Sequence, residues 1–263
     1  MMEGEVESVG VRSVATSLGM PASSAHRTIS ALVEEGFLQK DSASGKYALS
    51  LDVLRLAHNV VELWPIRRIA LQAMRRHLKP CNEAVFLTLY NADRQQVISV
   101  ASVESTHALR YTVELNVWKA MYVGAAGLAI MAHLPLPERQ SIVENTKLAP
   151  LTDKSITDPV VLEATLAEIR QRGYSLSRGQ RIPGGLGLAA PIFGPSGAVF
   201  AAVGLSIPEN RFDDSKEQWL AELVIACTRD ITREIGGSVA KFDEKEKKRE
   251  TRTRETGHDE QAI

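Results

Sequence analysis

The sequence predicts an α+β protein: an N-terminal winged helix-turn-helix, a linker helix and a C-terminal antiparallel sheet domain with helices. Three observations predict this class. Residues 11–49 have the order helix, tight turn, helix, hairpin; residues 52–63 carry apolar stripes at helical spacing; and strand-like and helical segments follow from residue 84 onward. A chain of 263 residues with 44% hydrophobic and 24% charged residues is long and apolar enough for two modest domains.

The N-terminal elements follow from periodicity and turn residues. Residues 11–18 place apolar side chains at positions i, i+3, i+4 and i+7, and Gly19 follows as a C-terminal cap. After the turn at Met20-Pro21, residues 22–35 predict a second helix, which Ser23 or Ser24 is expected to cap. Two short strands, 37–39 and 46–49, flank the turn formers of residues 41–45.

The remaining elements are predicted in the same way. We expect helices over 52–63, 66–78, 124–134, 137–145, 158–172 and 216–235. We expect strands over 84–90, 96–103, 109–115, 174–177, 188–193 and 199–206. Residues 237–263 contain seven basic and seven acidic side chains and few large apolar ones, which is typical of a charged disordered tail.

Charge and cysteine usage bound the environment and partners. The net charge is −1, yet residues 11–80 hold ten basic and five acidic side chains, which suggests an electrostatic partner for this part. Cys81 and Cys227 stand far apart, which fits a reducing compartment, and no signal peptide is visible. The longest apolar stretch, 120–136, is shorter than the roughly 20 residues that span a bilayer. We therefore expect a cytoplasmic protein without a membrane partner.

The second helix of a helix-turn-helix lies in the major groove, with its N-terminal residues against bases and phosphates. Hydroxyls and an arginine at that end suit such contacts, and the hairpin offers lysines as a wing. The candidate DNA-binding residues are Ser23, Ser24, His26, Arg27, Thr28, Ser30, Lys40 and Lys46. The pattern alone also permits a plain helical hairpin with a solvated polar face.

The run VRSVATSLGMPASSAHRTISALVEEGFLQKDSASGKYALS closely resembles the winged helix of the IclR family of bacterial regulators. The matching motifs are Leu18-Gly19, the Ser-Ser-x-His-Arg of residues 23–27, the Gly-Phe-Leu of 36–38 and the Gly-Lys-Tyr-Ala-Leu of 45–49. The resemblance extends to about Gly236. It implies a ligand-modulated transcription regulator that binds a double-stranded DNA operator, without deciding between repression and activation.

One departure from the family concerns the first helix. The family has a further helix before the segment that begins at Val11, and residues 1–10, MMEGEVESVG, do not read as one. A late start codon, a truncation or loss of the element would each explain this. The alternative function is therefore an effector-binding or interaction protein that no longer binds DNA.

The C-terminal half resembles the family's effector-binding domain, a GAF-like sheet with helices on both sides. The matching stretches are GLAIMAHLP, residues 127–135, and residues 173–208. The resemblance implies that a small-molecule effector is bound by Ala125, Ala126, Ser177, Gly187, Gly204 and Ser206. Leu109 and Met121 are further candidates that the resemblance supports less strongly. The residues themselves agree in kind, because pockets are mostly apolar with a few polar groups. The small residues of 124–127 would equally permit tight helix–sheet packing alone.

The nature of the effector follows from two glycines. Where carboxylate-binding relatives have a cysteine and a serine, this chain has Gly187 and Gly204, which removes two polar groups and adds room. We expect a bulkier effector, such as an aromatic acid, with Arg178 or Arg181 as its counter-ion. Solvation of both arginines is the alternative.

An enzyme is the main rival class, and no motif favours it. The sequence contains no G-x-S-x-G, P-loop or H-E-x-x-H pattern. Gly185-x-Gly187-x-x-Ala190 leads into a strand, so it lacks the context of a dinucleotide site. We expect no cofactor and no metal. The predicted domains are a winged helix over 1–50, a linker helix over 51–65 and an effector domain over 66–236; the apolar stripes of the linker predict a homodimer, or by resemblance a dimer of dimers.

Overall fold

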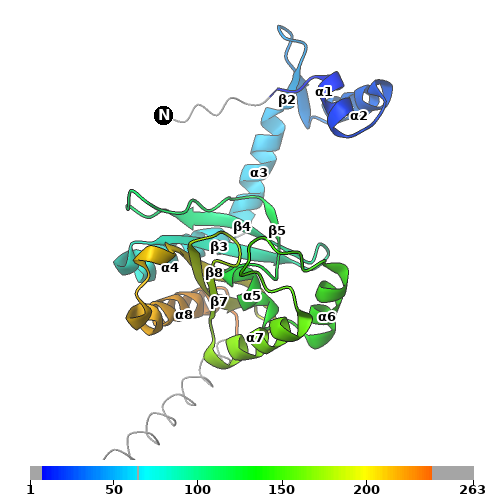
Figure 1. Ribbon diagram of the computed structural model, residues 1–263. Helices are drawn as coiled ribbons and strands as arrows, with labels where there is room; N and C mark the ends of the chain where they lie inside the picture. The colour runs from blue at the N-terminus through cyan, green and yellow to red at the C-terminus, as the bar shows by residue number, and fades with distance from the viewer. Residues whose placement is uncertain (1–7, 64, 239–263) are drawn as a thin grey trace, which may run out of the picture. The chain divides into compact units, whose positions relative to one another are not determined.

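The structure is a computed structural model that describes residues 8–63 and 65–238 (Figure 1). It divides into two compact units, residues 1–65 and 66–263. The expected disordered tail lies almost entirely outside the described residues, as do residues 1–7.

The first unit is a small helical domain with a β-hairpin. Its elements are α1 (Val11–Ser17), α2 (Ala22–Glu34), β1 (Leu38–Lys40), β2 (Tyr47–Leu49) and α3 (Leu51–Leu63). A small core of Ala15, Ala25, Ile29 and Tyr47 holds the first two helices to the hairpin. Val9 pairs with Tyr47 through two backbone hydrogen bonds of 2.8 and 2.9 Å, an addition to the hairpin that the sequence did not predict.

The ends of α1 and α2 show which local signals act. Gly19 and Gly36 follow the helices at φ +61° and +75°, a conformation that suits glycine. The expected serine cap of α2 was wrong, because Pro21 is the N-cap residue and no side chain caps the helix. Ser23 and Ser24 are the second and third residues of α2, so neither occupies the N-cap position from which a side chain accepts bonds from the first turn.

The second unit is built on one antiparallel sheet with the strand order β5-β4-β3-β8-β7-β6. The strands are β3 (Ala84–Asn91), β4 (Gln96–Val103), β5 (Trp118–Ala120), β6 (Ser175–Arg178), β7 (Gly185–Phe193) and β8 (Val199–Pro208). The α-helices are α4 (Ile66–Leu78), α5 (Ala125–Met131), α6 (Leu136–Asn145), α7 (Pro159–Arg172) and α8 (Glu217–Glu234). Short 3₁₀ helices cover Lys79–Cys81, Glu209–Arg211 and Asp214–Lys216.

The two faces of the sheet carry different layers. One face packs on α4 and α8 through branched and aliphatic side chains such as Leu87, Leu188, Val203 and Leu205. The opposite face packs on α5 and α7 through a second cluster that includes Ala189 and Ala202. Because side chains alternate along a strand, neighbouring residues of β7 and β8 belong to different layers.

Two predicted elements differ from the structure. Residues 109–115 form no strand; the chain there is an irregular segment, and the edge strand is the shorter β5. The apolar helix predicted over 124–134 is reduced to the seven buried residues of α5, which Gly124 precedes at φ +85°. Cys81 and Cys227 are free thiols. No helix in the described part of the chain has both the length and the apolar character needed to cross a membrane.

Candidate ligand pocket and candidate nucleic-acid interface

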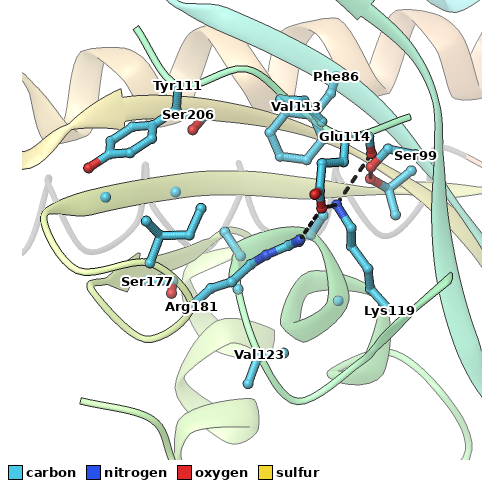
Figure 2. A pocket seen from close by; sticks show the side chains of 18 of the residues that line it. Phe86, Ser99, Tyr111, Val113, Glu114, Lys119, Val123, Ser177, Arg181 and Ser206 are labelled. Carbon is cyan, nitrogen blue, oxygen red and sulfur yellow. Dashed lines mark hydrogen bonds and ion pairs between the residues drawn. The ribbon is translucent and has the colours of Figure 1, made fainter. Parts of the chain in front are cut away.

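A cavity of about 450 Å³ lies in the second unit, against the α5-bearing face of the sheet. Residues from β3, β4, β5, β6, β7, β8 and the N-terminal end of α5 line it, together with the irregular segment at 111–114 (Figure 2). The volume is within the range of small-molecule sites, roughly 300–1,000 Å³. It can hold a small organic molecule.

The register of the sheet brings part of the predicted set together. Ser177 of β6 pairs with Gly187 of β7, which pairs with Ser206 of β8. The three residues therefore stand in one row across the sheet, and all three line the cavity. Ala125 and Ala126 line it from α5.

Packing and pocket formation both account for the small residues at 124–127. A Cβ at Gly127 would lie 2.3 Å from the backbone oxygen of Met121, so this glycine permits a close backbone approach. Ser175 is fully buried and donates a 2.6 Å hydrogen bond to the backbone oxygen of Ala125, which holds the start of α5 against β6. The sequence left two explanations open, and both apply: residues 124–127 all line the cavity, and Gly127 also permits the close approach to Met121.

Three predicted effector-binding residues lie outside the cavity lining. Leu109 is 63% exposed on the irregular segment, and Met121 is buried in the core beside α5. At Gly204 the expected extra room is absent, because the Phe86 ring fills it: a Cβ there would meet ring atoms at 2.6 and 2.8 Å. Phe86 and Gly204 are register partners on β3 and β8, a pairing that no local pattern reveals.

The charged centre of the cavity consists of Lys119, Arg181 and Glu114. One Glu114 carboxylate oxygen lies 3.2 Å from Lys119 Nζ and 3.5 Å from Arg181 Nη2. Burial, with the nearby Arg181 charge, lowers the pKa of Lys119, and burial lowers the pKa of Arg181. The cavity thus holds two desolvated cations that share one carboxylate, with a formal charge of +1.

The polar side chains around this centre are mostly engaged. The Thr88 and Ser99 hydroxyls lie 3.0 Å apart, and the Tyr111 hydroxyl donates to the Pro183 oxygen at 3.1 Å. The Ser177 hydroxyl donates to Gln180 at 3.0 Å. These bonds hold the walls of the cavity in place.

The two candidate counter-ion arginines have different positions. Arg178 lies outside the lining, where it pairs with Asp214 and Glu217 and stacks on Phe212. Arg181 lies in the lining and points toward Glu114 (Figure 2). Only Arg181 is therefore placed to meet a ligand in this cavity.

Sequence reasoning missed Lys119, Glu114, Phe86 and Tyr111 as lining residues. The lone lysine of Val117-Trp118-Lys119-Ala120-Met121 was the one available signal, because a charge inside an apolar run needs a partner. The other three depend on contacts between distant segments.

The candidate nucleic-acid interface lies on α2 and the hairpin. Ser23, His26, Arg27 and Thr28 are exposed, while Ser24 and Ser30 are half-buried. The Thr28 hydroxyl donates to the Ser24 backbone oxygen at 3.1 Å. On the hairpin, Lys40 and Lys46 are exposed, and Lys40 Nζ lies 5.9 Å from the centre of the Tyr47 ring.

The basic excess expected for the DNA-binding part is located elsewhere. Residues 1–65 hold five basic and eight acidic side chains, a formal charge of −3, because the unit ends before α4. Arg67, Arg68, Arg75, Arg76 and Lys79 belong to the second unit. What favours an electrostatic interface on α2 is local: residues 22–33 include His26 and Arg27 and no acidic side chain.

A helix-turn-helix unit followed by a unit with a ligand-sized cavity defines a class of protein, the ligand-responsive transcriptional regulators. Two family models match: the IclR helix-turn-helix domain over residues 1–42 and the bacterial transcriptional regulator IclR C-terminal domain over residues 58–233. The chain belongs to the IclR family. It is a DNA-binding transcriptional regulator with a C-terminal effector-binding domain, as the sequence predicted.

Individual relatives agree with this assignment. The chain is 32% identical to the HTH-type transcriptional regulator KipR of Bacillus subtilis over 83% of this chain and 86% of KipR. It is 25% identical to the transcriptional repressor IclR of Escherichia coli over 88% and 84% of the two chains. A crystal structure of an IclR regulator from Silicibacter sp. TM1040 has a TM-score of 0.77 and 26% identity, covering 90% of this chain and 92% of its own. These similarities confirm the α+β fold.

One further solved structure contains a small acid. An IclR homologue from Microbacterium hydrocarbonoxydans was crystallised in complex with 4-hydroxybenzoate; it has a TM-score of 0.73 and 21% identity, covering 88% of this chain and 94% of its own. At this identity the likeness shows the fold. Among the described residues of the present chain, no group of three His, Cys, Asp or Glu side chains could hold a metal ion.

Proposed function

We propose that a small organic acid binds in the cavity of the second unit and thereby modulates binding of the protein to its operator. The observation that carries this is the pair of desolvated cations, Lys119 and Arg181, facing an otherwise largely apolar cavity of about 450 Å³. A carboxylate pairs with such cations, and apolar walls bind an aromatic or aliphatic body. The binding of 4-hydroxybenzoate by one relative is consistent with an acid of this size.

The acid-binding residues in this proposal are Lys119, Arg181, Ser206 and Ser177, with Ala125, Ala126 and Gly187 as the surface beneath the ligand. Calorimetry with benzoate, 4-hydroxybenzoate and phenylacetate, and with the uncharged benzamide, tests it. Arg181→Met or Lys119→Met should weaken acid binding at least tenfold. Arg178→Met is the matched control, because Arg178 is the last residue of β6, three residues before Arg181, but lies outside the lining.

If the acids bind with equal affinity to Arg181→Met, Lys119→Met and the wild type, the cavity is not their site. Equal affinity for benzoate and benzamide would show that charge does not select the ligand. Tighter binding of glyoxylate than of benzoate would contradict the proposed size of the effector.

DNA binding is proposed to use the exposed end of α2, with Arg27 forking onto a guanine and Ser23, Ser24, His26, Thr28 and Ser30 near phosphates and bases. Lys40 and Lys46 would contact the DNA backbone from the hairpin. Arg27→Ala should weaken binding to the upstream intergenic DNA by about 1–3 kcal/mol and relax specificity at one position. Lys46→Ala should weaken binding to all sequences alike.

We further propose that the protein acts in the cytoplasm as a homodimer, or a dimer of dimers, and is not an enzyme. Leu51, Leu54, Leu56 and Val60 of α3 are exposed apolar side chains, which a second α3 could cover. Pairing of α3 helices would set the spacing of two winged helices on a two-fold operator. The domain division proposed is 1–50, 51–65 and 66–236. Leu54→Glu should shift the mass measured by analytical ultracentrifugation toward the monomer.

A further inference from the structure

Glu114 lies where the carboxylate of an acidic ligand would bind. Its carboxylate lies between the two cations that the proposed function assigns to the effector, at 3.2 Å from Lys119 Nζ and 3.5 Å from Arg181 Nη2 (Figure 2). An acid that paired with both cations would need the same place. Of the residues that line the cavity, Glu114, Lys119 and Arg181 are the ones with charged side chains.

Exposure shows from which side the carboxylate reaches this place. The Lys119 side chain is 12% exposed, whereas the Glu114 side chain is 68% exposed. Glu114 therefore lies at the solvent side of the cavity and extends inward to a nearly buried ammonium. The Glu114 backbone oxygen also accepts a hydrogen bond of 3.3 Å from Lys119 Nζ, so both the backbone and the carboxylate of Glu114 contact the lysine.

The energetics favour an internal counter-ion here. Two like charges that are withdrawn from water lose hydration free energy and also repel each other. A buried cation without a partner is therefore strongly unfavourable. Glu114 relieves this cost when the cavity is empty, and an effector carboxylate relieves it when the cavity is filled. The two carboxylates are then alternatives for one anion position.

The segment that carries Glu114 is held by few other contacts. Residues 104–117 form neither helix nor strand. Asn82 anchors the start of this segment, because its side-chain oxygen accepts from the Thr106 amide and its backbone oxygen accepts from the Ser105 hydroxyl. Nearer Glu114, the bonds to other segments are those of the Asn116 amide to the Ser99 oxygen at 2.8 Å, the Tyr111 hydroxyl to the Pro183 oxygen at 3.1 Å, and Arg211 to the Leu109 oxygen at 2.9 Å. Release of the Glu114 side chain would thus remove one of a small number of anchors.

We propose that Glu114 is a tethered competitor of the effector: it occupies the anion position between Lys119 and Arg181 in the empty protein, an acidic effector displaces it, and displacement loosens the segment from Tyr111 to Asn116. The proposal rests on the proposed function for the identity of the ligand. It adds that Glu114 lowers the affinity of the protein for acids, and that the segment from Tyr111 to Asn116 is held less tightly when the cavity is occupied.

The test compares Glu114→Gln with Glu104→Gln, a matched control whose carboxylate pairs with Arg110 at 3.8 Å and lies outside the cavity lining. Calorimetry uses benzoate, 4-hydroxybenzoate and phenylacetate. We expect Glu114→Gln to bind at least one of them about fivefold to tenfold more tightly than the wild type, because a partly exposed ion pair is weak and removal of a competing state raises affinity by its population. Glu104→Gln should match the wild type.

Hydrogen exchange in the ligand-free protein gives a second test of the proposal. Hydrogen exchange of the Asn116 amide should be faster in Glu114→Gln than in the wild type, by about fivefold or more, because one anchor of its segment is lost. Unchanged exchange at this amide would overturn the tether even if no acid in the panel bound.

The outcomes separate this inference from the proposed function. If Lys119→Met weakens acid binding while Glu114→Gln leaves it equal or weaker, the competitor proposal is wrong and the acid site stands. If neither Lys119→Met nor Arg181→Met weakens binding, the acid site itself is wrong. With phenylglycine as a zwitterionic probe, a loss of affinity in Glu114→Gln would show that the carboxylate binds an ammonium, which also overturns competition.

Discussion

The two faces of the six-stranded sheet are made of alternating residues of the same strands, yet one face is closed and the other holds a cavity. On the α4 and α8 side, β7 and β8 present Leu186, Leu188, Leu205 and Ile207. On the other side the intervening positions include Gly187, Ala189 and Ser206, while the Phe86 ring covers Gly204. Large side chains fill the space beneath the helices, and small or hydroxyl side chains leave part of it empty. The pocket therefore arises from the small size of the residues at alternate positions of β7 and β8.

Breaking the closed face should have the largest effect. Leu188→Ala removes a fully buried side chain, so we expect the free energy of unfolding to fall by about 2–5 kcal/mol. Urea denaturation followed by circular dichroism measures it. Ser206→Ala on the open face is the control, with an expected change within about 0.5 kcal/mol. Equal losses for both variants would contradict the distinction between the faces.

A larger side chain on the cavity-bearing face should weaken ligand binding. A Cβ at Gly187 would lie 3.1 Å from Ala125 Cβ, and a larger side chain would extend over the cavity floor. We expect Gly187→Leu to weaken acid binding at least tenfold and to cost about 1–3 kcal/mol of stability. Calorimetry and urea denaturation measure the two effects. Retention of wild-type affinity would show that the acid does not lie on this row.

The contact between Gly204 and Phe86 can sharpen the comparison. In Gly204→Ala the new methyl group would meet the Phe86 ring at 2.6 Å, which should push the ring toward the cavity and weaken acid binding about threefold. Phe86→Leu added to this variant should restore part of the loss, with a coupling energy of about 0.5–2 kcal/mol in a double-mutant cycle. Additive effects would mean that the two residues do not share this space.

The pH dependence should be the smallest effect. Burial and the Arg181 charge lower the pKa of Lys119 below the ordinary 10.5, and Glu114 is the carboxylate that faces it. Acid binding favours the charged lysine, so affinity is fully present below the free protein's pKa and falls as pH rises through it. Because this pKa lies below 10.5, the fall begins at a lower pH than for an ordinary lysine, and by pH 10.5 we expect a loss of about threefold to tenfold. Calorimetry of Lys119→Met should show a flat profile; an identical fall in that variant would assign the titration to another group.

Much of the fold could be predicted because its signals are local. The apolar spacing in α1 and α2, and the glycines Gly19 and Gly36 that follow them, depend on neighbouring residues only. Residues 109–115 misled the prediction, because their alternation resembles a strand while backbone pairing depends on an available partner strand. Periodicity describes which side chains share a face, but not whether a ladder forms.

The site was less predictable because it depends on register and long-range contacts. The row of Ser177, Gly187 and Ser206 was predicted by resemblance, whereas Gly204 was placed in the pocket although Phe86 covers it from β3. Glu114 and Arg181 come from segments more than sixty residues apart. Their ion pair requires the folded sheet, so no spacing in the chain indicates it.

The central claim is that an acid bound in the cavity changes the affinity of the protein for its operator. The most direct test is fluorescence anisotropy of labelled upstream intergenic DNA. The DNA is titrated with the full chain in the absence and in the presence of saturating acid from the panel. Coupling between the two sites predicts that the acid changes operator affinity of the wild type at least fivefold, and that Arg181→Met binds the same DNA equally well but no longer responds. If the acid alters DNA binding equally in both proteins, or if the wild type binds DNA and acid without either affecting the other, the account of a ligand-modulated regulator acting through this cavity is contradicted.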